Sequence, residues 1–253
     1  MINNVIDEAE NAINWIRNYV ANSGAKGVVL GNSGGKDSAT VLAMAVKALG
    51  KEKVLAVGMP CNSIPEDLED AWLVANHFGV KMIVVDLTTT YNEFEKTIQD
   101  EIKCELINES KINIKPRLRM TTLYGIAQNY GYLVIGTGNL CERMVGYTTK
   151  WGDSSFDFNP IGNFTVQEVL AIGEYLGVPE KIIKKAPSDG LGGLTDEQKL
   201  GVTYKQISEF IETGKTDEFA MSIIKCKYNS SKHKRVLPPM YYFERDNYLE
   251  EQF

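Results

Sequence analysis

Apolar residues at the start of the chain recur at the spacing that places side chains on one face of a helix. They are Ile2, Val5, Ile6, Ala9, Ile13, Ile16 and Val20, and they predict an amphipathic helix over residues 2–22. Further helices are predicted over 39–48, 66–78, 91–108, 113–130 and 166–176. In the 91–108 segment, we expect one apolar stripe to be core, formed by Phe94, Ile98, Ile102 and Leu106.

Short runs of consecutive apolar residues alternate with these helices, at 27–31, 53–59, 80–86 and 132–137. Such runs are typical of strands buried on both faces of a sheet. The alternation predicts an α/β fold, in which a single-domain, Rossmann-like parallel sheet is flanked by helices. With 253 residues, 43% of them hydrophobic, the chain is long enough to form one such domain over 1–253.

The loops after the predicted strands are the expected place for a ligand, because open parallel sheets bind ligands beyond the carboxyl ends of their strands. We expect the loops that follow residues 31, 59, 86 and 137 to converge on one site. The loop from Pro60 to Pro65 offers backbone groups against which an adenosine could lie. An ordinary turn stiffened by proline explains the same residues equally well.

A glycine loop opens directly from the first strand, in the run GVVLGNSGGKDS at 27–38. Gly34 and Gly35 have no Cβ, so backbone N–H groups can close around an anion. The helix that follows directs its positive end at the same place. We therefore expect a nucleoside triphosphate or pyrophosphate here, and the simpler alternative is a glycine turn that only joins strand to helix.

The spacing within this loop distinguishes it from two common nucleotide motifs. Only three residues separate Gly31 from Gly35, and Asp37 stands between the lysine and the serine, so a Walker loop is excluded. The glycines also lack the G-x-G-x-x-G spacing of a dinucleotide fingerprint. The segment Ser33–Ser38 instead resembles the pyrophosphate loop of the ATP pyrophosphatases, which split ATP into AMP and pyrophosphate.

Two carboxylates are expected near the phosphate. Asp37 lies in the glycine loop, and Glu142 follows the last predicted strand together with the hydroxyl of Thr137. Magnesium prefers oxygen ligands and usually keeps phosphate oxygens in its shell. The pair therefore predicts a Mg²⁺ site, although either acid alone is more often a helix cap or a surface charge.

Composition narrows the functional class. The net charge of −6 argues against a protein that follows nucleic-acid phosphates. Cys61, Cys104, Cys141 and Cys226 form no paired motif, so neither a zinc site nor a disulfide framework is predicted and a reducing cytoplasm fits best. We expect no membrane partner, because the chain has neither a bilayer-length apolar stretch nor a signal peptide at its start.

The run GTGNLCERMVGYTTKWGDSSFDFNP is similar to a characteristic stretch of the ammonia-dependent NAD synthetases, a family of pyrophosphate-loop enzymes. The resemblance covers nearly the whole chain and implies an adenine nucleotide alpha hydrolase-like fold. Other segments that resemble the family in order and spacing are 115–120, 185–188, 200–204, 233–235 and 238–239.

The resemblance also implies roles for individual residues. For ATP these are Gly31, Asn32, Ser33, Gly34, Gly35, Lys36, Asp37, Ser38, Thr137 and Ser188. For Mg²⁺ they are Asp37 and Glu142, and for deamido-NAD they are Arg117, Tyr147, Lys150, Asp157, His233 and Lys234. Asp37, Asp153 and Asp157 are the candidate catalytic residues, with Asp153 or Asp157 able to take a proton from ammonium.

The implied reaction is the amidation of deamido-NAD to NAD. The nicotinate carboxylate attacks the α-phosphorus of ATP, pyrophosphate leaves, and ammonia then displaces AMP from the acyl adenylate. Because a glutamine-hydrolysing domain has no room before the first helix, we expect free ammonia or ammonia from a separate protein. The family further implies a homodimer.

One departure from the family concerns charge. Many members have a lysine shortly after the Asn-Pro pair, but residues 161–166 contain none. Thr165 supplies no charge and is well placed to cap the helix that follows. We expect the missing charge to come from Lys36, Lys184 or Lys185, although the variable place of Lys36 in the loop favours a side chain that points to solvent.

Two later segments have unusual composition. Residues 187–197 are rich in glycine and small polar residues, which predicts either a mobile loop over bound nucleotide or an inert linker. The tail, 230–253, begins with a basic run that is either a solvated face or a cover for an anionic substrate.

Other functions remain open from the residues alone. One is a pyrophosphate-loop ligase acting on a different carboxylate or acceptor, such as a tRNA-modifying thiolase, although the chain lacks paired cysteines and a basic domain. Another is a nucleotide-binding sensor without catalysis, which the missing lysine would allow.

Overall fold

A parallel sheet forms the centre of the molecule, as predicted. The computed structural model describes residues 4–185 and 195–241. The strands lie in the order β3-β2-β1-β4 and all neighbouring pairs are parallel. Because β4 lies on the opposite side of β1 from β2, the strand order reverses between β1 and β4, where such sheets bind ligands. The strands are β1 (Gly27–Gly31), β2 (Val54–Gly58), β3 (Lys81–Val84) and β4 (Tyr132–Val134).

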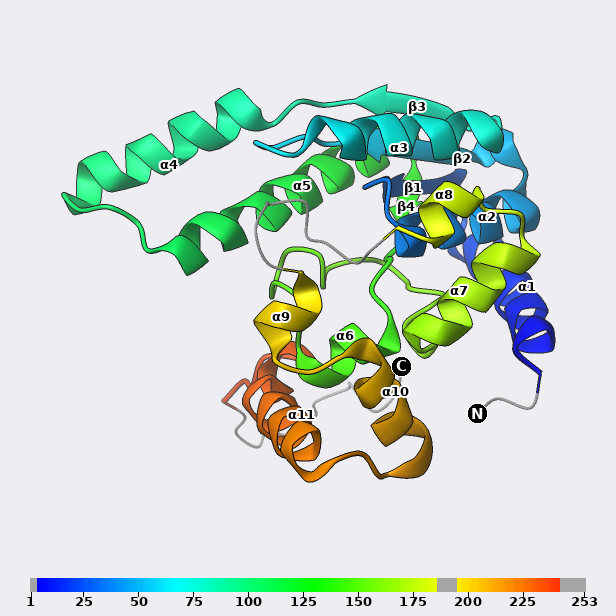
Figure 1. The fold of residues 1–253 in the computed structure, drawn as a ribbon. Coiled ribbons are helices and arrows are strands. Elements are labelled where there is room, and N and C mark those ends of the chain that lie inside the picture. Colours follow the sequence, from blue (N-terminus) through cyan, green and yellow to red (C-terminus); the bar gives the residue numbers. More distant parts are fainter. Residues whose placement is uncertain (1–3, 186–194, 242–253) are drawn as a thin grey trace, which may run out of the picture.

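Helices cover both faces of this sheet (Figure 1). On one face, α2 (Lys36–Leu49) lies between the sheet and the helices α1 (Val5–Ser23) and α7 (Val166–Tyr175). Its side chains are therefore buried almost all around. The same core includes side chains of α3 (Pro65–His77) and α8 (Glu180–Ile183), while α5 (Asn108–Tyr130) packs against β1 and β4 on the other face.

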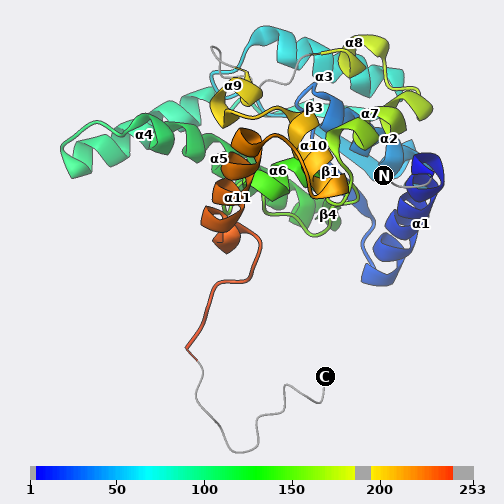
Figure 2. The same ribbon diagram turned by 60° about the horizontal axis from the view of Figure 1, so that its bottom comes forward.

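A second, smaller core lies beside the carboxyl end of the sheet. It is built by α6 (Leu140–Val145), α9 (Asp196–Leu200), α10 (Tyr204–Thr213) and α11 (Glu218–Ser230), which gather in the view of Figure 2. Val166, at the start of α7, belongs to this core, and Thr165 caps that helix as predicted. The short turn η2 (Lys232–Lys234) follows α11, and the described chain then runs away from the body (Figure 2).

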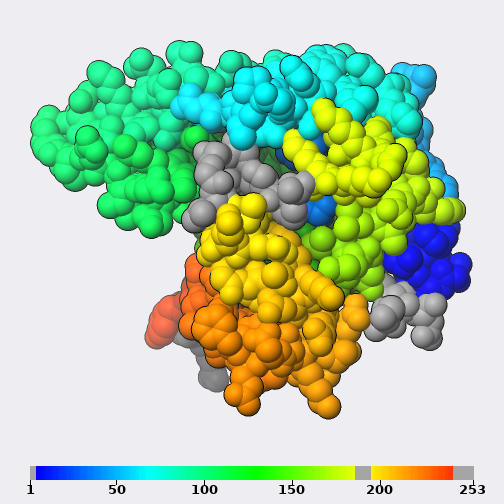
Figure 3. Space-filling model, in the orientation of Figure 1, coloured from blue at the N-terminus to red at the C-terminus, as the bar shows by residue number. Residues whose placement is uncertain are grey.

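The prediction of a single helix over 91–108 is wrong. The structure has α4 (Thr88–Ile102), which ends at Lys103 in the left-handed conformation, and α5 begins only at residue 108. Phe94 and Ile102 are 47% and 49% exposed, because α4 and the first half of α5 project from the body as an arm (Figures 1 and 3). Only Ile98 and Leu106 of the predicted stripe pack against a core, the small cluster around Tyr91.

Other boundaries differ less. The strand predicted over 27–31 is confirmed as β1, whereas the other three strands are shorter than predicted and the helix at 66–78 is shifted by one residue. The short turn η1 (Lys51–Lys53) precedes β2. Residues 187–194 of the predicted mobile loop lie outside the described residues, but 195–197 are ordered, since Thr195 caps α9. Residues 242–253 of the tail also lie outside the described part. No helix of the described residues is long and apolar enough to span a bilayer.

The glycine loop packs tightly against α3, and this contact requires glycine at position 34. Gly34 has φ +73°, which L residues rarely adopt. A Cβ at Gly34 would lie 2.4 Å from the carbonyl oxygen of Asp67 and 2.8 Å from Cβ of Asp70. The path of the loop is thus set by the close approach of two backbone segments.

We predict that G34A destabilises the protein by at least about 2 kcal/mol, because the strained backbone and the overlap with α3 add together. G125A is the matched control, since Gly125 lies in α5 with nothing within 4 Å of an added Cβ. It should be neutral or stabilising by up to about 1 kcal/mol. Urea unfolding at neutral pH measures both, and equal stabilities for the two variants would contradict the prediction.

A buried carboxylate on α3 ties this helix to the chain around α8. Asp70, whose side chain is 3% exposed, lies 2.5 Å from Nζ of Lys181 and 2.7 Å from Nζ of Lys185. Lys185 also contacts Asp67 at 2.8 Å. Burial opposes ionisation of Asp70, but hydrogen bonds from the two lysines outweigh it and hold the pKa of Asp70 below its usual value.

We predict that D70N lowers the free energy of unfolding by about 2 kcal/mol at pH 7, because it leaves the lysines without their buried partner. The folded-state pKa is depressed, so the contribution is complete above the ordinary aspartate pKa of about 4 and is lost as the pH falls through the folded value. Urea unfolding across this pH range should show the difference from wild type shrinking in acid. E180Q, which removes an exposed pair with Lys184, should cost less than about 0.5 kcal/mol; an equal cost for both variants would refute the prediction.

Candidate active site

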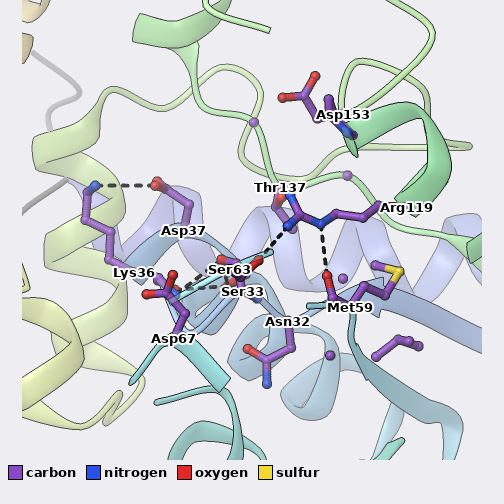
Figure 4. A pocket seen from close by; sticks show the side chains of 18 of the residues that line it. Asn32, Ser33, Lys36, Asp37, Met59, Ser63, Asp67, Arg119, Thr137 and Asp153 are labelled. Atoms are coloured by element: carbon purple, nitrogen blue, oxygen red, sulfur yellow. Dashed lines mark hydrogen bonds and ion pairs between the residues drawn. The ribbon is translucent and has the colours of Figure 1, made fainter. Parts of the chain in front are cut away.

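A cavity of about 340 Å³ lies beyond the carboxyl ends of β1, β2 and β4 (Figure 4). Its lining includes the glycine loop, the loop after β2 with Pro60, Ser63 and Ile64, and the segment 135–138 after β4. The loop after β3 does not line it, contrary to expectation. That loop instead starts α4, where the Asp86 side chain accepts a hydrogen bond from the backbone N–H of Thr88. The predicted convergence on one site is therefore confirmed for the loops after β1, β2 and β4, but not for the loop after β3.

The glycine loop is fixed by its own side chains, which accept hydrogen bonds from the backbone N–H groups of Ser33, Gly34 and Gly35. Ser38 Oγ accepts a hydrogen bond from the Ser33 N–H at 3.3 Å and donates one to the Gly35 carbonyl at 3.0 Å. The Gly35 N–H donates to Ser33 Oγ at 3.3 Å, and the Asn32 amide fixes the loop to α3 by donating to the Ala71 carbonyl at 2.8 Å. All of the loop residues predicted for ATP line the cavity except Gly34, which packs against α3.

The two predicted metal ligands, Asp37 and Glu142, meet in this cavity. Asn139 links them: its side-chain amide donates to Asp37 Oδ1 at 3.3 Å, and its carbonyl oxygen accepts the Glu142 N–H at 3.1 Å in the cap of α6. Burial raises the pKa of the Glu142 carboxyl well above its usual value, and the negative charge of Asp37 raises it further. The site therefore holds two acidic side chains whose negative charges are not fully neutralised by their surroundings.

A divalent cation fits this pair. Its charge would relieve the repulsion between the carboxylates, and oxygen atoms are the ligands that magnesium prefers. Among the described residues, no group of three or more His, Cys, Asp or Glu side chains is arranged to hold a metal ion. Asp37 and Glu142 would thus provide part of a coordination shell and leave the remainder to phosphate oxygens and water, as is usual for Mg²⁺.

Lys36 points into the cavity, so the expectation that it faces solvent is wrong. Its side chain is only 10% exposed, and Nζ lies 3.5 Å from Asp37 Oδ2 (Figure 4). The ammonium also lies 5.9 Å from the ring centroid of Tyr204. Of the other proposed sources of charge, Lys185 lines the cavity, whereas Lys184 pairs with Glu180 on the surface.

Arg119 and Asp153 form the other side of the cavity (Figure 4). The Arg119 guanidinium donates to the Met59 carbonyl and to Ser63 Oγ, each at 3.0 Å, and so fixes the loop after β2. Asp153 accepts a hydrogen bond from the Thr149 N–H at 2.5 Å, while burial raises the pKa of its carboxyl. The sequence analysis assigns no role to Arg119. Its place in the segment 115–120, which resembles the family, was the signal that could have identified it.

Two more cavity residues, Asp196 and Tyr204, come from the second core and were not predicted. Tyr204 follows the cap of α10, and burial raises the pKa of its phenol. Asp196 is the first residue of α9 and accepts a hydrogen bond from the Tyr147 hydroxyl at 3.0 Å. Both lie far from the glycine loop in sequence, so no local pattern connects them to it.

The residues predicted for deamido-NAD do not form one cluster. Lys150 and His233 line a second hollow of about 420 Å³, and the Arg117 guanidinium donates to the Lys150 carbonyl at 3.2 Å. Tyr147 is connected to the first cavity by its hydrogen bond to Asp196, which lines that cavity. The Lys234 ammonium donates hydrogen bonds to the backbone carbonyls of Gly146 and Thr148, at 2.7 and 2.6 Å.

Asp157 lies outside both hollows. Its carboxylate accepts hydrogen bonds from the Val134 N–H at 2.7 Å and from the Tyr124 hydroxyl at 3.3 Å, so it fixes the end of β4. Of the predicted catalytic residues, Asp37 and Asp153 therefore share the cavity and Asp157 does not. Thr137 lines the cavity, and Ser188 lies outside the described residues.

Sequence comparisons place the chain in a known family. The model of the NAD synthase family matches residues 8–241. An NH3-dependent NAD+ synthetase of Carboxydothermus hydrogenoformans is 46% identical over 92% of this chain and 96% of its own. These matches confirm the resemblance inferred from the motifs.

Solved structures agree with the fold. The NMN synthetase of Francisella tularensis superimposes with a TM-score of 0.89 at 34% identity, over 95% of this chain and 99% of its own. The NH3-dependent NAD synthetase of Campylobacter jejuni, in complex with nitrate, superimposes with a TM-score of 0.78 at 30% identity, over 94% of this chain and 100% of its own. This chain therefore belongs to the NAD synthase family and, within it, to the NH3-dependent NAD+ synthetases, which are ligases.

Proposed function

We propose that the enzyme converts deamido-NAD to NAD with ATP and free ammonia, through an acyl adenylate. The observation that carries this proposal is the single cavity that joins the glycine loop, the acid pair Asp37 and Glu142, and Asp153. The curated relatives are named for NH3 and NAD+, which supports ammonia as the nitrogen source and the dinucleotide as the product.

ATP is proposed to bind with its phosphates over the glycine loop and the start of α2, where the helix dipole favours anions. The adenosine would lie toward the loop after β2, whose position Arg119 fixes. Asp37 and Glu142 would hold Mg²⁺, which when bound supplies positive charge for the departing pyrophosphate. The protein itself would contribute the in-line placement of two anionic substrates.

The chemistry follows in two steps. A carboxylate oxygen of the substrate attacks the α-phosphorus of ATP and the bond to pyrophosphate breaks, which leaves an acyl adenylate. Ammonia then adds to the acyl carbon, and AMP leaves with the former carboxylate oxygen. Ammonium must lose a proton before it can attack, and Asp153 is the proposed acceptor, because its raised pKa makes it a stronger base than an ordinary aspartate.

One of the similar structures suggests an alternative acid substrate. The structure with the TM-score of 0.89 is named an NMN synthetase, whose acid would be the mononucleotide rather than the dinucleotide. Both substrates present the same nicotinate carboxylate and differ in the adenylate half. The second hollow, lined by Lys150 and His233, is a region where anionic groups of either substrate would find cations.

We expect the purified enzyme, with ATP, Mg²⁺ and ammonium, to amidate deamido-NAD with release of one AMP for each amide formed. Chromatography of the nucleotides measures the products, and nicotinic acid mononucleotide is assayed in parallel. If kcat/KM were larger for the mononucleotide than for deamido-NAD, the mononucleotide would be the preferred substrate and the proposal would be wrong on this point. AMP release only with another acceptor would favour a different ligase, and ATP binding without turnover on any acid would favour a sensor.

Asp153 has a separate test. We expect D153N to lower kcat/KM for ammonia at least about a hundredfold, because removing a general base typically costs that much. Formation of the acyl adenylate, followed by exchange of labelled pyrophosphate into ATP, should change much less. D157N serves for comparison, since Asp157 lies outside the cavity. If D153N impaired both half-reactions equally, Asp153 would have no specific part in ammonia activation.

We also infer a homodimer. The arm formed by α4 and the first half of α5 exposes Phe94, Ile102 and Ile107, the last by 66%, and large exposed apolar patches commonly mark protein interfaces. The family resemblance supports the same inference.

A further inference from the structure

Lys36 is a largely covered cation without a strong partner. Among the described residues, Lys36, Arg119 and Lys185 are the cations that line the cavity. Arg119 is engaged by a carbonyl and a hydroxyl at 3.0 Å, and Lys185 by two carboxylates at 2.7 and 2.8 Å. The Lys36 ammonium instead has one ion pair, at 3.5 Å, and a distant ring.

The partner of Lys36 is also a proposed metal ligand. Asp37 Oδ2 faces the ammonium, and the same carboxylate faces Glu142 across the Asn139 amide. A divalent cation at this acid pair attracts Asp37 more strongly than a single ammonium at 3.5 Å does. Binding of the metal would therefore weaken the one ion pair that Lys36 has in the free enzyme.

An ammonium that is largely covered and loses its anion needs another one. The Lys36 side chain is only 10% exposed, so water cannot fully replace a lost partner. Lys36 is the first residue of α2, where the helix dipole already attracts anions, and the glycine loop precedes it directly. A nucleotide phosphate over this loop is the anion within reach.

Taking these observations together, we propose that Lys36 exchanges Asp37 for the terminal phosphates of ATP when the metal–nucleotide complex binds. In the free enzyme the Lys36–Asp37 pair partly neutralises the acid pair. In the complex, Lys36 supplies to the phosphates the charge that residues 161–166 cannot, since that stretch holds no lysine. Lys185 is less suited to this role, because Asp67 and Asp70 already balance its charge and that of Lys181.

The inference rests on ATP being the nucleotide of the cavity, and binding without the acid substrate tests it independently of turnover. Calorimetric titration with ATP or AMP in magnesium should show K36M binding ATP about tenfold more weakly than wild type, the loss expected for one charge-assisted hydrogen bond. Its affinity for AMP, which lacks the terminal phosphates, should stay within about twofold. K36R keeps the charge and should recover part of the ATP affinity.

Two controls separate this effect from charge loss in general and from misfolding. K184M removes an exposed lysine that pairs with Glu180 and should bind ATP as wild type does. Magnesium alone should bind K36M at least as tightly as wild type, because the acid pair then has no competing ammonium, whereas a misfolded variant would bind it less well. The inference fails if K36M binds ATP with wild-type affinity, or if ATP and AMP weaken equally. If wild type itself does not bind ATP, the proposed function fails first.

Discussion

The repulsion between two carboxylates in one cavity is the constraint around which this site is organised. Asp37 and Glu142 come from the segments that follow β1 and β4, neighbouring strands between which the sheet reverses its order. Asn139 holds both carboxylates, since its side-chain amide donates to Asp37 and its backbone N–H donates to Glu142. Burial keeps the pKa of Glu142 high. A site so arranged has a standing affinity for positive charge, whether that charge is a metal ion or the ammonium of Lys36.

The rest of the cavity complements that acidic centre. The positive end of α2 faces the cavity on one side, and Arg119 holds the loop after β2 on the other. The approach of α3 to Gly34 fixes where the loop lies, and the buried carboxylate of Asp70 secures α3 to the segment after α8. The glycine loop and the acid pair thus meet where the order of the strands reverses.

Those parts of the structure that follow from backbone topology could be predicted from the sequence. Buried strands give long apolar runs, and parallel strands place their carboxyl ends at one edge, so the meeting of Asp37 and Glu142 needed no knowledge of side-chain packing. Where orientation depends on contacts distant in sequence, prediction fails. Lys36 turns inward beside Tyr204 of the second core. Asp157, and not Asp153, accepts a hydrogen bond from the backbone of β4, at the N–H of Val134. Likewise, periodicity identified an apolar stripe on α4 but could not reveal that the helix leaves the body.

The composition of the cavity has a consequence for how the protein is made. Its wall of Asp196 and Tyr204 belongs to helices synthesised long after the glycine loop. Chains fold progressively as they leave the ribosome. A nascent chain that ends before α10 contains the segments of all four strands but lacks Tyr204, one of the residues that line the cavity. The cavity is therefore complete only after α9 and α10 have been synthesised.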